Sequence, residues 1–344
     1  MLKRNLKYAA LAVTLGISGL AWAGGNNANV NQNGAGNNGA ITQNSVGFAN
    51  ASIDQTGTNN TGSINQHNCC NPVGTISQVG NSNSAAIDQE NVAGTTAAVT
   101  QNGSFNQANI TQKPGGTSGV PITDNASATI NQSGDRSNAT IYQEGSYNSD
   151  AVITQATYQG SATINQIGGD NNTAGINQNN AYYTHARIDQ TGSGNTANID
   201  QSSPSGSPFS DYSHAYISQS SDGNTATINQ WSAYTSDASV YQSGGGSHYA
   251  YVQQGPGNYL NASVNQYGGG GEGPGETATI LQSSDYNFAW VNQGGTGNVA
   301  YINQSGVGTG DAHNNATISQ IGSNNHGSIV QTGGAGNNAS ISQN

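Results

Sequence analysis

The stretch Asn224-Thr-Ala-Thr-Ile-Asn-Gln230 contains the pattern that recurs through this chain. Its alternate positions hold Asn, Ala, Ile and Gln, and the residues between them are small and polar. A small residue, then Ile or Val, then Gln at alternate positions recurs 26 times between Ala28 and Gln343. A period of two is typical of a strand with one buried face, and Ile and Val favour strands. Each copy therefore predicts one short β-strand.

The spacing of these strands predicts how they are connected. The closing Gln residues are separated alternately by 11 and 12 positions, as in Gln32, Gln43, Gln55, Gln66 and Gln78. The repeating unit is therefore about 23 residues, with two strands and two turns. Gly commonly stands two places after the Gln, where a tight turn needs a positive φ.

Two all-β architectures fit this pattern, a flat antiparallel meander and a parallel solenoid. The meander would leave its Ile and Ala face uncovered, whereas the inward faces of a two-sheet solenoid bury each other. The solenoid also stacks identical residues on successive rungs, so that side-chain amides can hydrogen-bond along the axis. The sequence therefore predicts a parallel two-sheet β-solenoid of about 13 rungs and about 26 strands, roughly 60 Å long.

We expect one solenoid domain over residues 24–344, with enlarged turns near 113–126, 202–212, 267–275 and 305–313. The inward Ile and Gln side chains form its predicted stacking core. Representative members are Ile41, Gln43, Ile53, Gln55, Ile64, Gln66, Ile130, Gln132, Ile164, Gln166, Ile199, Gln201, Ile228, Gln230, Ile302, Gln304, Ile318 and Gln320.

Residues 1–23 have the features of a secretory signal peptide. A basic segment precedes a short apolar run that ends at Leu20, and Ala21-Trp22-Ala23 fits an A-x-A cleavage signal. The run is too short to span a membrane. We expect cleavage after Ala23 and secretion of the remaining chain, which is not membrane-embedded.

The mature chain would be strongly acidic. Lys113, Arg136 and Arg187 remain against all 17 acidic residues, a formal charge of −14. This sign disfavours nucleic acid and anionic membranes as partners. So few basic groups also argue against a β-helical polysaccharide lyase, and the six His show no repeated spacing with Ser and Asp. No catalytic residue, cofactor or metal site is predicted, and we expect no enzyme.

Three side features allow more than one interpretation. His67 and the adjacent Cys69 and Cys70 could bind a soft metal or form a disulfide, but an incidental turn that exposes both thiols is favoured.

Outward aromatic residues could bind polysaccharide, dyes or neighbouring fibrils, although cross-rung packing is favoured. These are Tyr142, Tyr216, Tyr241, Tyr251, Trp290 and Tyr301. Outward acidic residues could bind Ca²⁺, but a role against premature aggregation is favoured. These are Asp54, Asp88, Asp189 and Asp200.

The repeated A-x-[IV]-x-Q-x-G-x-x-N-x-A-x-[IV]-x-Q resembles the curlin repeat of bacterial curli, and Gln190–Gln201 follows it closely. This resemblance implies a secreted amyloid subunit of biofilms that polymerises end to end. It also implies an outer-membrane secretion pore, a nucleator subunit and periplasmic chaperones as partners. The chain departs from the family in its larger number of repeats and its short Gly/Asn-rich segment. The Ser or Asn that opens a strand is replaced in several repeats, by Pro72, His248, Leu260 and Glu276.

We therefore expect a structural subunit that adds to a fibre by stacking its first rung on an exposed last rung, with both ends open. Solenoids that do not polymerise need atypical capping repeats, and the terminal motifs here are regular. The predicted polymerising positions are Val30, Gln32, Ile41, Gln43, Ile329, Gln331, Ile341 and Gln343. A fibre nucleator and a monomeric solenoid that binds ice or a surface are the alternatives. Ice binding by a solenoid would require an outward Thr-x-Thr ladder, which the repeats lack.

Overall fold

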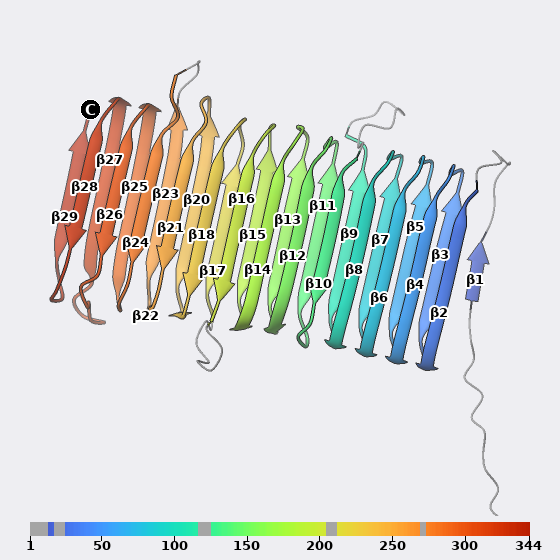
Figure 1. Cartoon of the computed structure of the whole chain (residues 1–344). Helices are drawn as coiled ribbons and strands as arrows, with labels where there is room; N and C mark the ends of the chain where they lie inside the picture. Colours follow the sequence, from blue (N-terminus) through green and yellow to red (C-terminus); the bar gives the residue numbers. More distant parts are fainter. Residues whose placement is uncertain (1–12, 17–24, 116–124, 204–211, 269–272) are drawn as a thin grey trace, which may run out of the picture.

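Two parallel β-sheets face each other along the whole length of the body (Figure 1). The structure is a computed structural model, and it describes residues 13–16, 25–115, 125–203, 212–268 and 273–344. Successive strands alternate between the two sheets, so each pair of strands forms one rung and the next pair stacks on it. The predicted all-β solenoid of about 13 rungs is confirmed.

The sheets are named here by their strands. Sheet A contains β1 (Val13–Gly16), β3 (Asn38–Asn44), β5 (Thr61–His67), β7 (Ser84–Glu90), β9 (Gln107–Lys113), β11 (Asn138–Glu144), β13 (Ser161–Ile167), β15 (His185–Thr191), β17 (His214–Gln219), β20 (Asp237–Gly244), β23 (Asn261–Gly268), β25 (Asn287–Thr296), β27 (Asn314–Ser323) and β29 (Asn338–Gln343).

Sheet B contains β2 (Asn27–Ala35), β4 (Asn50–Thr58), β6 (Val73–Asn81), β8 (Thr96–Ser104), β10 (Ser127–Gln132), β12 (Asp150–Tyr158), β14 (Thr173–Tyr182), β16 (Thr196–Ser202), β18 (Thr225–Trp231), β21 (Tyr249–Gln254), β24 (Thr277–Gln282), β26 (Val299–Gln304) and β28 (His326–Gln331). A short third sheet pairs β19 (Ala233–Tyr234) with β22 (Gly257–Asn258). Both strands belong to segments in which the chain passes from sheet B to sheet A.

Register is fixed by the repeat, because equivalent residues of consecutive rungs are paired directly. In sheet B, Ile153 pairs with Ile176 and Gln155 pairs with Gln178. Where a turn is longer, the extra residues leave the ladder and the next strand resumes in phase, as at Gln201 and Gln230. Insertions therefore change the corners and leave the stacked positions unchanged.

The core is a thin layer between the sheets, one row of Ala and one of Ile or Val from each. These residues form one continuous hydrophobic cluster that runs along the described body. Within the strands, buried and less buried residues alternate, as the period of two predicts. A thin core suits this composition, because a chain poor in large apolar residues could not fill a wide interior.

Glycine is required where corners stack most closely. Gly57 has φ +113°, and a Cβ atom there would lie 2.0 Å from the carbonyl oxygen of Gly80 on the next rung. The same close approach joins Gly80 to Gly103. A larger residue would separate the rungs, which explains why glycine returns at this corner.

Two of the four expected enlarged turns, near 113–126 and 202–212, lie largely outside the described residues, as do residues 269–272 of the third. The fourth, residues 305–313, connects β26 to β27 and contains an antiparallel bridge between Thr309 and Ala312.

At the N-terminus the structure differs from the expectation of two open ends. Strand β1, from the predicted signal peptide, pairs in parallel with β3 in sheet A. An unpaired sheet edge accepts a β-prone segment, and Val13-Thr14-Leu15 is one. The predicted cleavage residues Ala21 and Ala23 lie outside the described residues.

Replacing one inward isoleucine should destabilise the solenoid strongly. Ile188 on β15 is fully buried, so Ile188→Ala should lower the free energy of unfolding by about 2–5 kcal/mol. Ile167 on the neighbouring β13 is 44% exposed and provides the matched control, Ile167→Ala, for which we expect about 0.5 kcal/mol or less. Denaturant titration of both variants measures the difference, and equal losses would contradict the assigned faces.

Candidate functional site

A continuous ladder of glutamine amides lies on the inward face of each sheet. Gln178 donates from Nε2 to Oε1 of Gln201 on the next rung, at 2.8 Å, and to the backbone carbonyl of Ser161 in the facing sheet, at 3.2 Å. The same arrangement recurs along both sheets, for example from Gln143 to Gln166. Each amide thus connects neighbouring rungs and the two sheets.

The structure places the glutamines of the predicted stacking core in these ladders and its isoleucines in the hydrophobic cluster between the sheets. All of them are buried except Gln43, which is half-buried in the first rung. Leaving a buried amide without its partner costs about 1–3 kcal/mol. The ladders therefore stabilise only the register in which every glutamine meets another.

A second amide ladder is formed by the asparagines that open many strands. Asn83 accepts a hydrogen bond at Oδ1 from the backbone N–H of Asn106 on the next rung, at 3.0 Å. Its Nδ2 donates to the carbonyl of Gly103 at 2.9 Å. The recurrence of Asn in the sequence indicated stacking, but the backbone partners follow only from the corner geometry.

The two end rungs are complementary. In the last rung, Nε2 of Gln331 and of Gln343 donates to backbone carbonyls, with no further glutamine among the described residues to receive it. In the first rung, Oε1 of Gln32 and of Gln43 accepts no hydrogen bond from the described residues. One end therefore offers the donors that the other end could accept.

The predicted end positions are less enclosed than the interior ones. Ile329 and Gln331 on β28 are buried. Ile341 and Gln343 on β29 are partly exposed, as are Val30 and Gln32 on β2, whereas Ile41 on β3 is buried. The outer edges of β2, β28 and β29 have no strand partner among the described residues. These edges can pair with another chain.

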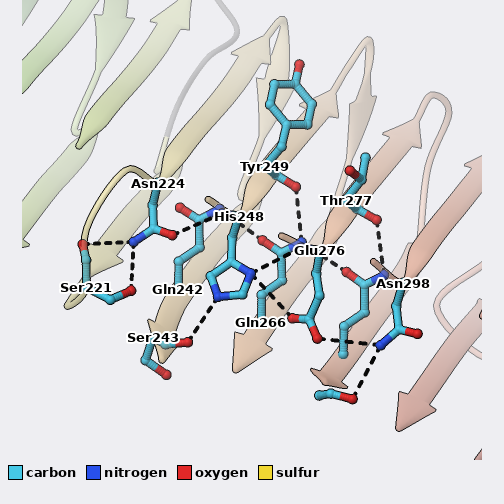
Figure 2. A network of polar contacts seen from close by, with 12 residues as sticks. Ser221, Asn224, Gln242, Ser243, His248, Tyr249, Gln266, Glu276, Thr277 and Asn298 are labelled. Carbon is cyan, nitrogen blue, oxygen red and sulfur yellow. Dashed lines mark hydrogen bonds and ion pairs between the residues drawn. The ribbon is translucent and has the colours of Figure 1, made fainter. Parts of the chain in front are cut away.

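His248 and Glu276 replace asparagine on consecutive rungs of sheet B, and Figure 2 shows the resulting network. Nδ1 of His248 accepts the backbone N–H of Glu276 at 3.2 Å, as an asparagine Oδ1 would. Nε2 lies 3.2 Å from the carbonyl of Ser243. Since Nδ1 accepts, the proton is on Nε2 and the ring is neutral. Burial also lowers the pKa of His248.

Glu276 is poorly matched to its position. Its side chain is fully buried, and its Oε2 has no hydrogen-bond partner, although it lies 3.5 Å from Nδ1 of His248. Oε1 receives one long hydrogen bond, of 3.5 Å, from Nδ2 of Asn298. Burial raises the pKa of Glu276 to about 7, against the smaller opposing effect of its hydrogen bonds. The pair was recognised in the sequence only as two departures from the repeat.

The two cysteines differ, contrary to the expectation that a turn exposes both. Cys69 is buried in a small cluster with Val46, Ala49 and Val92, and Cys70 is exposed. Both thiols are free. Burial, with a smaller effect of Cys70, raises the pKa of Cys69 to about 12. Side chains from successive corners therefore pack into a small hydrophobic cluster, which the alternating pattern of the strands does not predict.

The outward side chains make contacts between rungs. Tyr216 and Tyr241 meet edge to face at 5.4 Å, and the Arg187 guanidinium lies over the Tyr216 ring. Asp189 accepts hydrogen bonds from Arg187 and Tyr216. Along the described strands, each paired carboxylate has neutral or basic neighbours, for example Asp237 beside His214. This arrangement avoids the like-charge contacts that would destabilise stacked rungs.

No family model matches the chain, and no curated protein matches it. Within the described residues, no helix has the length and apolar character needed to cross a membrane.

The carboxyl group of Glu276 should make stability depend on pH. Between pH 4.5 and about 7 the folded protein retains a proton that the unfolded chain releases, so stability falls as pH rises, by about 3 kcal/mol in total. Glu276→Gln removes this dependence, and its stability relative to the wild type should therefore rise from pH 4.5 to 8. Urea titrations across this range measure the difference. His248 is present in both proteins, and a difference independent of pH would contradict the prediction.

Only one thiol of the folded protein should react with a disulfide reagent at pH 8. Cys70 is exposed, whereas Cys69 is buried and stays protonated. We expect one fast equivalent by absorbance, and a second only after unfolding. Cys70→Ser should abolish the fast reaction, and Cys69→Ser should leave it intact. Two fast equivalents in the folded wild type would show that the corner is open.

Proposed function

We propose that this protein is a secreted structural subunit that self-assembles by end-to-end stacking of β-rungs into extracellular, curli-like amyloid fibres. In this proposal the fibres serve biofilm formation, adhesion and surface attachment. The observation that carries the proposal is the match between the first and last rungs, and the curlin-like repeat supports it.

Stacking one subunit on another would continue both sheets in register. Residues 326–331 of β28 would pair with residues 27–32 of β2 in the next subunit, and residues 338–343 of β29 with residues 38–43 of β3. Ile329 would then meet Val30, and Ile341 would meet Ile41. These pairings repeat those that join β26 to β28 and β27 to β29 within the chain.

The side-chain amides would continue in the same way. Gln331 would donate to Gln32, and Gln343 to Gln43, which gives Oε1 of Gln32 and of Gln43 the donors that they lack among the described residues. The four strands of the joint carry no Lys, Arg, Asp or Glu. Two strongly acidic subunits would therefore meet at uncharged rungs, where repulsion opposes stacking least.

Strand β1 bears on when assembly would begin. It pairs with β3 in the register that β29 of a preceding subunit would take, with Val13–Gly16 opposite Gly39–Thr42. In the proposal, removal of residues 1–23 frees this edge. Secretion through an outer-membrane pore, periplasmic chaperones and a nucleator remain partners implied by the resemblance.

A seeded thioflavin-T time course on the chain without residues 1–23 tests the proposal. Sonicated fibres should abolish the lag, and fibre diffraction should give reflections near 4.7 and 10 Å. The full-length chain should respond more slowly because β1 occupies the edge of β3. A chain that stays monomeric and folded in the presence of seeds would contradict the proposal.

Two variants of the last strand test the joint itself. Ile341→Lys places a charge between the sheets, whereas Ser342→Lys places the same charge on the outer face of the same strand. The first variant should add to wild-type seeds through its intact first rung and then stop further growth, so that small amounts inhibit elongation. The second should elongate normally. Equal elongation by both would exclude this rung as the growing end.

A further inference from the structure

A row of six tyrosines follows one corner of the solenoid, where the chain passes from sheet B to sheet A. The row, called here the tyrosine ladder, consists of Tyr158, Tyr183, Tyr212, Tyr234, Tyr259 and Tyr286. It has one member on each of six consecutive rungs. These tyrosines are distinct from the outward-facing aromatic residues in the middle of the strands.

The rings contact one another along the whole ladder. Tyr183 and Tyr212 are stacked at 5.0 Å with an interplanar angle of 4°. Tyr259 and Tyr286 are stacked at 4.9 Å and 14°. The remaining neighbours meet edge to face at 6.3–6.4 Å. The corner therefore holds an unbroken series of phenol rings.

The backbone disfavours bulky residues at this corner. Tyr183, Tyr212, Tyr259 and Tyr286 have φ values of 54°, 60°, 55° and 56°. Large side chains are rare in this left-handed region, which Gly and Asn tolerate. In the first rungs Gly36 and Asn59 occupy the same corner position. These four tyrosines therefore occupy a backbone conformation that large side chains rarely adopt.

The rings also do little to fill the core. Tyr183, Tyr212 and Tyr259 are 38%, 48% and 42% exposed, so a large part of each side chain faces solvent. Stacked phenols that are open to solvent are suited to one-electron oxidation, because a radical formed on one ring can pass to the next. They are also close enough to react with each other.

We propose that the tyrosine ladder is an oxidative cross-linking site, at which a haem peroxidase and hydrogen peroxide join neighbouring tyrosines as dityrosine, preferentially Tyr183 to Tyr212 and Tyr259 to Tyr286. Each phenol loses an electron and its hydroxyl proton, and the two radicals join through the ring carbons next to the C–O carbon. The hydrogen on each joined carbon moves to the phenol oxygen. Overall the pair loses two hydrogen atoms, and one hydrogen peroxide becomes two waters.

Such a bond would join consecutive rungs covalently at the surface. A cross-link between segments distant in sequence limits the unfolded chain, so it should raise resistance to denaturant. The proposal concerns rungs within one chain and does not depend on whether subunits form fibres.

Peroxidase treatment of the dilute, folded full-length chain tests the proposal, with Cys70 alkylated first because its exposed thiol would compete for oxidant. Dityrosine fluorescence should rise, and mass spectrometry of peptides should show both preferred pairs in several-fold excess over links to Tyr147 or Tyr249. Those two tyrosines are as exposed as the ladder members, at 40% and 43%, but lie outside the ladder. In denaturant the preference should disappear.

Two variants separate the ladder from general tyrosine reactivity. Tyr212→Phe keeps the stacked ring and removes the phenol, so the Tyr183 link should be lost while the Tyr259–Tyr286 link remains, and fluorescence should fall by about half. Tyr249→Phe should leave the yield unchanged. The proposal is overturned if links spread evenly over exposed tyrosines, if folded and denatured chains give the same links, or if none forms while free tyrosine is oxidised in the same mixture.

Discussion

The glutamine amide that donates to the next rung and accepts from the previous one is the interaction on which this structure depends. A buried amide can be satisfied in this way only if an identical amide lies directly above and below it. Parallel strands, constant register and the displacement of every insertion into a corner follow from this requirement. The row of isoleucines adds packing, but packing alone would tolerate small shifts that the amides do not.

The same requirement explains which replacements the stack accepts. At the strand-opening position an acceptor is needed for the next backbone N–H, and the neutral His248 ring supplies one through Nδ1. Glu276 has no comparable arrangement, and its buried Oε2 has no hydrogen-bond partner. One irregular rung is tolerated because each rung contacts only its neighbours, so the defect stays local.

The corners are subject to different structural constraints from the strands. Their backbone needs positive φ and close approach, which glycine meets at Gly57 and Gly80. In the later rungs the same corner, from sheet B to sheet A, holds large rings at positive φ, as at Tyr212 and Tyr259. The inward faces of the two sheets are nearly invariant from rung to rung, whereas the corners vary, and the buried Cys69 and the tyrosine ladder lie at the corners.

The sequence by itself determined the strands, their two faces, the repeat of about 23 residues and the parallel stack, because side-chain alternation and in-register pairing are both strictly periodic. It also identified His248 and Glu276 as irregular. Only the tertiary structure decided that Cys69 is buried beside an exposed Cys70, that Oε2 of Glu276 has no hydrogen-bond partner and that the tyrosine rings meet along one corner. Corner geometry depends on turns of unequal length. Because these turns do not repeat at a constant spacing, the sequence does not predict which corner side chains contact each other.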